Sequence, residues 1–361
     1  MKVVHVETGR HLYGGAQQVI YLARGLQQRG LDNIIVCLPG SAIDSVARQS
    51  NLHVHNIDCG GDLDFRFMSR LRRFLAESRP DVVHGHSRRG ADFMGVRAAR
   101  MAKIPAILSR RVDSRDNRFI AKLRYAGFRR IIAISENVAL SLRESSVNSD
   151  RVVTIRSAVD TATVIEKTDR GTWLREFDLP EDAVVAVIVA QLIERKGHRF
   201  MLDAMPAICR ETPDFRLIIF GKGPLETALR EQAAQLGVAE NVRFAGFRSD
   251  VDAMLGHADM LVHPALQEGL GVSMLKASAA GLPVVAFDVA GAREAVVADK
   301  TGLLVKCGDA NALLQAVTHL IENPPVRKQF GAAGLVRMRE SFSIDEMVDK
   351  HIDVYESVIN E

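Results

Sequence analysis

Short apolar runs alternate with amphipathic segments along nearly the whole chain, and this alternation most constrains its fold. Strands that are apolar throughout and are separated by helices are typical of parallel sheets covered on both faces. We therefore predict an α/β protein built from doubly wound, Rossmann-like sheets. The predicted strands are residues 3–7, 33–38, 53–57, 81–84, 106–108, 131–134 and 152–155, then 183–190, 216–220, 242–244, 260–262, 284–287 and 303–305.

The series of strands restarts near Asp182, and 361 residues are too many for one ordinary core, so we predict two domains. A polar, strand-poor segment places the linker near residues 157–159. The last helical pattern, 344–359, is too far from the second sheet's strands to be needed there, so we assign it to the first domain. The predicted domains are 1–157 plus 344–361, and 158–343. Predicted helices include residues 17–29, 68–78, 197–210 and 224–236.

Charge is divided unevenly between the two halves. Residues 1–160 carry 26 Lys+Arg against 15 Asp+Glu, whereas residues 161–361 carry 21 against 29. Of the 26 cations, 23 are arginine, which favours planar anions such as carboxylates and phosphates. The first half is therefore expected to meet an anionic partner, either an acidic substrate, a membrane face or nucleic acid. Aromatic residues make up only 6% and are not interleaved with the cations, which argues against nucleic acid.

Three features indicate a cytoplasmic protein. No apolar run approaches the roughly 20 residues of a membrane span. The chain starts directly with a strand pattern, so we expect no signal peptide. The four cysteines are scattered and form no CxxC pair, as is typical of reduced thiols. The basic first half adds the expectation of contact with the cytoplasmic face of the inner membrane.

Residues 263–283 form the most informative segment for function. The pattern predicts a strand end, a glycine loop that carries Glu268, and a helix closed by Gly281. Such a helix N-terminus suits a phosphorylated ligand. After the first strand of the second half, Arg195 can bind a phosphate bidentately and Lys196 can act on it as a point charge. The alternative for these two cations is an ordinary charged turn.

Three further glycine segments lie at the ends of strands. Gly14–Gly15 opens a helix, where backbone N–H groups attract phosphate. Gly221 and Gly246–Phe247 follow strands of the second half and could shape a base pocket from backbone atoms. Each is weak alone, because ordinary turns also use glycine.

His84 and His86 alternate at the end of a strand and therefore share one face, at the sheet edge where doubly wound folds bind ligands. The alternative is a pair of satisfied histidines in a polar loop. A metal site is not expected, because no third ligand lies at a telling spacing. The Asp62-Leu63-Asp64 triplet lies in a glycine-rich loop, without the context of a DxD metal motif.

Two arginine pairs follow successive strands of the first half. They are Arg88–Arg89 and Arg110–Arg111, and both pairs fall at the carboxyl ends of strands. They could flank one cleft and bind an anionic acceptor, or form a solvated basic surface. The residues leave both interpretations open.

In order and spacing these motifs resemble glycosyltransferase family 4, of GT-B architecture, over nearly the whole chain. The matching segments are Gly14–Gly15, the PDVVHGH run 80–86, the AQLIERKG run 190–197, the segment from Glu268 through Lys276 to Val284, the GARE run 291–294 and the TGLLV run 301–305.

The resemblance implies a retaining transfer from a nucleotide sugar, held by the second domain, to an acceptor held by the first. It implies catalytic roles for His86, Glu268 and Lys196, and neither a metal nor another cofactor. The acceptor-binding positions would be Arg88, Arg89, Arg110 and Arg111. The donor-binding positions would be Gly14, Gly15, Gln191, Arg195, Lys196, Gly221, Gly246, Phe247, Glu268, Gly269, Leu270, Gly271, Val272 and Lys276.

Three positions depart from the family pattern. Gln191 replaces a phosphate-binding arginine, Leu270 replaces a phenylalanine, and Lys276 replaces a glutamate that accepts ribose hydrogen bonds. Lysine cannot accept such bonds. Lys276 could restore the lost cation at the diphosphate, suit a different donor, or mark a relative that has lost donor binding.

The resulting prediction is a hexosyl- or heptosyltransferase of lipopolysaccharide-core or surface-polysaccharide synthesis. Its donor would be UDP-, GDP- or ADP-linked, and its acceptor an anionic glycan or a lipid-linked sugar. The alternatives are a catalytically silent GT-B protein that binds an anionic glycan or partner, and a nucleotide-sugar epimerase.

Overall fold

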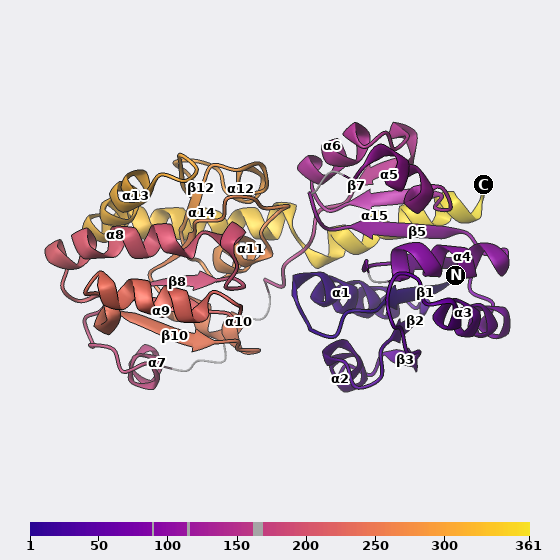
Figure 1. Ribbon diagram of the computed structural model, residues 1–361, viewed down its shortest axis with the longest axis horizontal. Coiled ribbons are helices and arrows are strands. Elements are labelled where there is room, and N and C mark those ends of the chain that lie inside the picture. The colour runs from indigo at the N-terminus through magenta and orange to yellow at the C-terminus, as the bar shows by residue number, and fades with distance from the viewer. Residues whose placement is uncertain (89, 114–115, 162–168) are drawn as a thin grey trace. The chain divides into compact units, whose positions relative to one another are not determined.

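The structure is a computed structural model that describes residues 1–361 except 89, 114–115 and 162–168. Within the described residues the chain divides into two compact domains (Figure 1). The first domain comprises Met1–Ala158 with Ile344–Glu361, and the second comprises Val159–Ser343. Each domain carries its own parallel sheet, of seven and six described strands respectively.

The first sheet has the order β3-β2-β1-β4-β5-β6-β7, so the strand order changes direction between β1 and β4 while all the strands remain parallel. Ligands of doubly wound folds bind beside such a switch point, at the carboxyl ends of the strands. Every run predicted as a strand in this half overlaps a strand of the structure. The strands are β1 (Lys2–Glu7), β2 (Asp32–Cys37), β3 (His53–Asn56), β4 (Val82–Gly85), β5 (Ala106–Arg110), β6 (Arg130–Ala133) and β7 (Val152–Thr154).

The C-terminal helix packs against the first sheet. Its apolar face, which includes Val348, Val354 and Tyr355, joins one buried cluster with α1 and the strands. A Cβ on Gly25 of α1 would lie 2.4 Å from Val348 Cγ2, so glycine lets the two helices approach closely. The helices of this domain are α1 (Gly14–Gln28), α2 (Ala42–Gln49), α3 (Phe65–Ser78), α4 (Val96–Met101), α5 (Arg118–Tyr125), α6 (Glu136–Glu144) and α15 (Ile344–Ile359).

The second sheet has the order β10-β9-β8-β11-β12-β13, with its switch point between β8 and β11. The predicted runs of this half each overlap a strand of the structure. The strands are β8 (Val184–Val189), β9 (Phe215–Phe220), β10 (Val242–Gly246), β11 (Met260–His263), β12 (Val284–Phe287) and β13 (Gly302–Val305). The helices are α7 (Arg170–Glu176), α8 (His198–Glu211), α9 (Glu226–Gln235), α10 (Val251–Met254), α11 (Val272–Ala279), α12 (Ala290–Ala295), α13 (Ala310–Glu322) and α14 (Pro324–Ser341).

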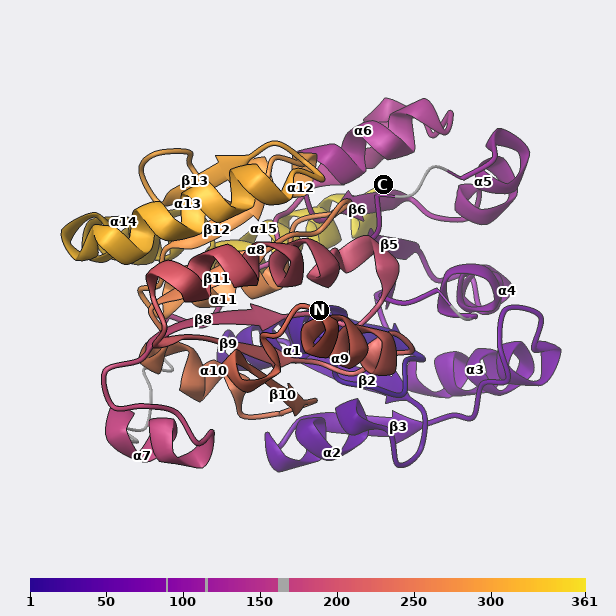
Figure 2. The same cartoon turned by 60° about the vertical axis from the view of Figure 1, so that its left-hand side comes forward.

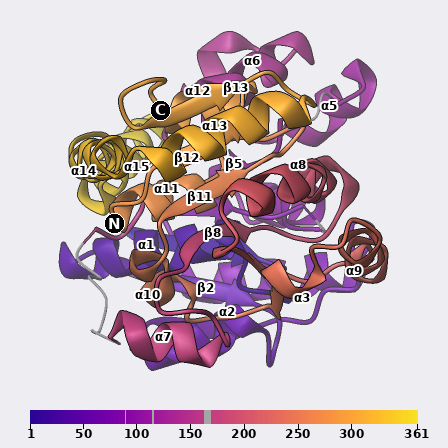
Figure 3. The same cartoon turned by 90° about the vertical axis from the view of Figure 1, so that its left-hand side faces the viewer.

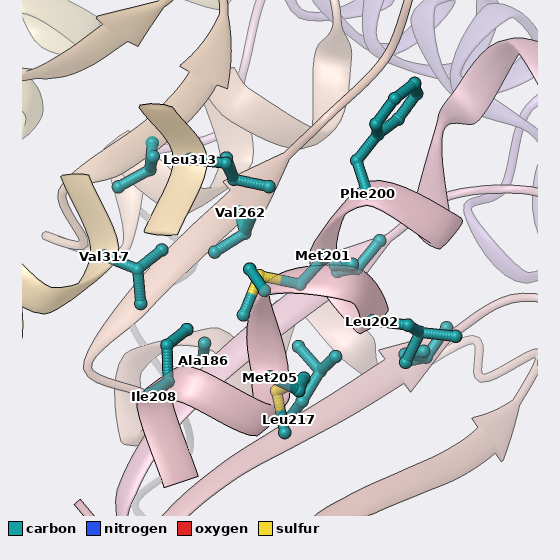
Figure 4. Close-up of a cluster of buried hydrophobic side chains, with 14 of the residues drawn as sticks. Ala186, Phe200, Met201, Leu202, Met205, Ile208, Leu217, Val262, Leu313 and Val317 are labelled. Atoms are coloured by element: carbon teal, nitrogen blue, oxygen red, sulfur yellow. The ribbon is translucent and has the colours of Figure 1, made fainter. Parts of the chain in front are cut away.

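The core of the second domain forms where α8 and α13 pack together on one face of its sheet (Figure 3). Met201 and Met205 of α8 meet Val262 of β11 and Val317 of α13 there (Figure 4). Alternate strand residues point to this face because the side-chain period of a strand is two. Helices α11 and α14 contact each other and the neighbouring strands.

Among the helices that the structure describes, none combines the length and the apolar character required to traverse a bilayer.

Candidate functional site

The N-terminus of α11 is built from backbone that only glycine adopts easily. Gly271 precedes the helix with φ of 75°, and its missing Cβ would lie 2.2 Å from Met274 Cε. No side-chain cap is found for this helix among the described residues. Its first N–H groups therefore suit an anionic ligand, as the segment 263–283 predicts.

Glu268, in the loop before α11, is held from two sides. Lys196, at the end of the short 3-10 turn Glu194–Lys196, donates from Nζ to Glu268 Oε2. His263, the last residue of β11, donates from Nε2 to the same oxygen over 2.9 Å. Ser273 Oγ lies 3.4 Å from His263 Nδ1, which is the acceptor nitrogen in this tautomer. The structure thus brings together Lys196 and Glu268, 72 residues apart in sequence.

The electrostatics of this cluster keep Glu268 ionised. Burial alone would raise its pKa, but the hydrogen bond from His263 and the charge of Lys196 outweigh burial and hold the pKa well below its usual value. Burial lowers the pKa of His263, so its imidazole is neutral at pH 7. A charged carboxylate is a strong acceptor for sugar hydroxyl groups.

Glycines bring the loops around this cluster into contact. A Cβ on Gly197 would lie 1.9 Å from Pro264 O, and one on Gly221 would lie 1.8 Å from Ala190 O. Gly221 N donates to Gly246 O over 2.8 Å, which joins the ends of β9 and β10. The expected donor positions Gly221, Gly246 and Gln191 therefore belong to adjoining loops of one domain.

The side chains at the other expected donor positions differ in exposure. Leu270 is 1% exposed, so its side chain belongs to the core. Phe247 is 50% exposed and Arg195 is also exposed. Leu266 N donates to Arg195 O, which ties the Arg195 turn to the loop that carries Glu268.

Lys276 lies on α11 and has a specific partner. Its Nζ lies 2.6 Å from Asp252 Oδ2 of α10, with 20% of the lysine side chain and 43% of the aspartate side chain exposed. Asp252 was not among the sequence-predicted site residues, because its four-residue helix carries no motif. The ion pair neutralises the charge that singled out Lys276.

The first domain has a cavity of about 390 Å³ at the carboxyl ends of β1, β4 and β5. The sequence-predicted residues Gly15, His86, Arg88, Arg110 and Arg111 all line it. It lies beside the switch point between β1 and β4, as expected for a doubly wound sheet. Arg89 lies outside the described residues.

His86 belongs to a buried histidine cluster that the sequence analysis found only in part. His5 of β1 is paired in register with His84 of β4, and His5 Nδ1 lies 3.0 Å from His86 Nε2. His84 contacts Tyr355 Oη and Ser109 Oγ, at 2.8 and 2.9 Å. Burial lowers the pKa of His5 to about 3, and also lowers the pKa values of His84 and His86 well below normal. The cluster is therefore neutral at pH 7.

The three histidines also correct one step of the sequence argument. A third nitrogen ligand does lie near His84 and His86, because strand pairing brings His5 beside them, with one nitrogen of each within 4.8 Å of the others. These imidazoles form hydrogen bonds to one another and to neighbouring hydroxyl groups, and a metal ion would have to replace these hydrogen bonds.

In the Asp62–Asp64 triplet, Asp64 caps α3 by accepting from Phe67 N.

Two of the predicted arginines are compensated by one aspartate. Arg88 lies 2.7 Å and Arg110 3.5 Å from the carboxylate of Asp116. Asp116 also accepts from Arg124 and from Tyr125 Oη, at 2.9 and 2.6 Å. The three arginines therefore share one carboxylate and are not a row of free cations.

Glu7 and Arg111 supply a second charged pair to the cavity. Glu7 ends β1, is 4% exposed, and accepts from Gly9 N over 2.8 Å. Burial raises the pKa of Glu7, against the lowering effects of its hydrogen bonds and of Arg111. Arg111 packs over Gly15, whose Cβ would lie 3.0 Å from Arg111 Cδ. Sequence reasoning missed Glu7, although its place at a strand end was a usable signal.

Two family profiles match the chain. Residues 169–336 match the family described as "Glycosyl transferases group 1", and residues 13–163 match "Glycosyltransferase Family 4". The chain is 25% identical to the lipopolysaccharide core biosynthesis glycosyltransferase LpsD of Rhizobium meliloti, over 99% of this chain and 98% of that one. It is 36% identical, over about half of each chain (49% and 48%), to a GDP-mannose-dependent alpha-(1-6)-phosphatidylinositol monomannoside mannosyltransferase of Mycolicibacterium smegmatis.

Among solved structures, Anabaena HepE in complex with UDP and glucose aligns with a TM-score of 0.88 at 17% identity, covering 99% of this chain and 100% of that one. This similarity confirms the predicted α/β fold of GT-B architecture for the present chain.

Proposed function

Because the chain belongs to glycosyltransferase family 4, we propose that it transfers a sugar, with retention of anomeric configuration, from a nucleotide sugar to an anionic glycan or lipid-linked acceptor. The transferred sugar would be a hexose or heptose, and the product a lipopolysaccharide core or surface polysaccharide. Similarity to LpsD over nearly the whole chain supports this pathway class.

The observation that carries the proposal is the cluster of Lys196, His263 and Glu268 at the open N-terminus of α11. The N–H groups from Gly269 to Val272 would bind the diphosphate, and Glu268 would accept hydrogen bonds from hydroxyls of the transferred sugar. Lys196 would stabilise the charge that develops on the leaving diphosphate. Gln191, Arg195, Gly221, Gly246 and Phe247 would complete the donor site.

The acceptor would enter the cavity of the first domain. Its wall offers Glu7 and Asp92 as acceptors for sugar hydroxyl groups and Arg111 as a cation for an anionic group. His86, with Nδ1 unpartnered among the described residues, would contact the sugar near the reacting carbon. Arg88, Arg89 and Arg110 would complete acceptor binding, whereas Gly14 and Gly15 would serve the donor through their backbone N–H groups.

Retention fits a front-face displacement in which the leaving phosphate oxygen takes the proton of the acceptor hydroxyl. The protein then needs no dedicated base, and it contributes positioning and charge stabilisation. We propose that this chemistry is independent of metal ions and of any cofactor.

The contact that Lys276 makes distinguishes between the three explanations of its departure from the family pattern. Its ion pair with Asp252 argues against a free cation that replaces the arginine missing at Gln191. We propose that the pair instead presents the Asp252 carboxylate as an acceptor for donor hydroxyls. The donor-site residues Glu268 and Lys196 argue against a protein that has lost donor binding.

The donor nucleotide would be UDP, GDP or ADP. UDP is bound in HepE, and GDP-mannose serves the mycobacterial relative, so these two nucleotides should be tested first. The place of action would be the cytoplasmic face of the inner membrane, with contact through the basic first domain.

Ligand-induced stabilisation tests the donor site directly. Each nucleoside diphosphate should be titrated in a thermal unfolding experiment, because a ligand that binds only the folded state raises its stability. We expect one of UDP, GDP and ADP to raise the unfolding temperature of the second domain, and Lys196→Met to abolish the shift. No shift with any nucleotide, together with binding of an anionic glycan, would instead favour a catalytically silent relative.

A further inference from the structure

Helix α5 of the first domain has an unusual outward face. Phe119 is 73% exposed, Ile120 50% and Leu123 51%, three large apolar side chains on eight residues. Val112, shortly after the end of β5, is 38% exposed. Large apolar side chains scattered singly on a surface are ordinary, whereas a cluster of them marks an interaction surface.

Cations accompany this apolar face. Arg118 and Lys122 are both exposed, one helical turn apart, and neither forms an ion pair with a described residue. Asp116, the acid at the start of this helix, is already held by Arg88, Arg110 and Arg124. The outward face therefore combines apolar side chains with a positive charge.

The inward face of α5 belongs to the cavity. Tyr125 lines it and donates to Asp116 over 2.6 Å, while Arg124 bonds to the same carboxylate. Val112 also lines the cavity and is itself partly exposed. The same short helix thus forms a wall of the cavity and carries the apolar, basic face, which lies at the periphery of its domain (Figure 2).

We propose that Val112, Arg118, Phe119, Ile120, Lys122 and Leu123 form a docking surface for a bilayer that contains anionic lipids. A basic helix face with large apolar side chains inserts at the boundary between headgroups and acyl chains. The flexible side chains of Arg118 and Lys122 reach phosphate groups while the apolar side chains enter the interface. This inference rests on the proposed function, and it makes a lipid-linked sugar, presented at the membrane surface beside the cavity, the acceptor class.

Vesicle co-sedimentation of the whole chain tests the surface. The probes are vesicles of phosphatidylethanolamine with about one third phosphatidylglycerol, and neutral phosphatidylcholine vesicles of the same size. We expect binding to the anionic vesicles that weakens with salt. The variant F119S/L123S should reduce this binding at least about tenfold, as should R118E/K122E. The matched control is Leu140→Ser on α6, a leucine that is 54% exposed and lies outside the docking surface.

The outcomes separate the surface from the proposed function. Unchanged vesicle binding by F119S/L123S would overturn the proposal, as would absence of binding by the unaltered chain. A monomer–dimer shift that this variant abolishes, without vesicle binding, would assign the face to a second copy and also overturn it. The docking surface would be supported if F119S/L123S still transferred sugar to a delipidated, water-soluble acceptor but no longer transferred it to the vesicle-borne acceptor. Lack of transfer to both acceptors by the unaltered chain would count against the proposed function alone.

Discussion

The Nζ atom of Lys276 lies 2.6 Å from Asp252 Oδ2, so the lysine that departs from the family pattern is neutralised within its own domain. An ion pair that is partly exposed contributes about 1 kcal/mol or less to stability. The pair is therefore better suited to orienting the Asp252 carboxylate than to holding the fold together. That distinction can be tested by substitution.

Lys276→Met and Asp252→Asn should weaken binding of the nucleoside diphosphate by similar factors, of about tenfold or less, because each disrupts the same carboxylate acceptor. The double variant should be no weaker than either single variant. Isothermal titration of the nucleotide that stabilises the protein measures all three. If Lys276→Met weakens binding while Asp252→Asn tightens it, then Lys276 acts as a cation on the diphosphate.

Glu268→Gln should lower kcat/KM by about a hundredfold or more, because a preorganised charge in a buried site stabilises the transition state. The change keeps the size of the side chain, so nucleotide affinity should change much less. Steady-state kinetics and a nucleotide titration on the same preparation give both values. Equal losses of affinity and of turnover would show that Glu268 serves ground-state binding only.

Gly197→Ala should destabilise the second domain by several kcal/mol, because the new Cβ would lie 1.9 Å from the backbone oxygen of Pro264. The matched control is Gly237→Ala. Gly237 has nearly the same φ, 69° against 66°, but no atom lies within 4 Å of the position that its Cβ would take. Gly237→Ala should lower the free energy of unfolding by about 1 kcal/mol, because alanine is strained in the left-handed backbone conformation. Urea denaturation measures both, and equal losses would contradict the tight contact with Pro264.

The first domain should lose stability as the pH falls below about 6.5. The pKa values of His5 and His351 are lowered by burial to about 3 and about 4, and those of His84 and His86 are lowered as well. Unfolded histidines take up protons near their ordinary pKa of 6.5, so the unfolded state binds more protons than the folded state below that pH. At about pH 5.5 the free energy of unfolding should be lower than at neutral pH by about 1 kcal/mol for each buried histidine.

Denaturation between pH 7.5 and 5.5 checks this dependence, and His351→Phe provides the internal comparison. That variant removes one titrating group, so its stability should fall less steeply over the same range. A stability that is constant or rises on acidification would show that the cluster is protonated in the folded protein.

Activity should survive a chelator, since the proposed chemistry uses Lys196 and the N-terminus of α11 to offset the charge of the diphosphate. We expect an unchanged rate after prolonged dialysis against EDTA. A loss that zinc or manganese restores would point to the nitrogens of His5, His84 and His86, and His5→Gln would then abolish the restoration.

The alternation of apolar runs was enough to predict both sheets, because buried parallel strands such as β8 and β12 need apolar side chains on both faces. The glycine loop with Glu268 was also predictable, since Gly271 and the following helix leave a local pattern. Contacts across the sheet could not be predicted from these local patterns. His5 meets His84 through strand register, and Tyr355 reaches His84 from the far end of the chain.

Pairing between charged side chains was equally hidden. Arg88 and Arg110 were expected either to bind an anionic acceptor or to form a solvated basic surface, but in the fold both pair with Asp116. Nothing in the sequence near Lys276 indicates Asp252, which lies 24 residues earlier. One-dimensional patterns report burial and local geometry, whereas partners of charged side chains depend on loops that only the folded chain brings together.

Release of nucleoside diphosphate is the most direct measure of sugar transfer by this protein. The chain should be incubated with UDP-, GDP- and ADP-linked sugars, each with and without acidic core glycans or lipid-linked sugars, beside Glu268→Gln as control. We expect one donor to release its nucleoside diphosphate only when an acceptor is present, and Glu268→Gln nearly to abolish the release. No release with any donor and acceptor pair, or release that Glu268→Gln leaves unchanged, would contradict it.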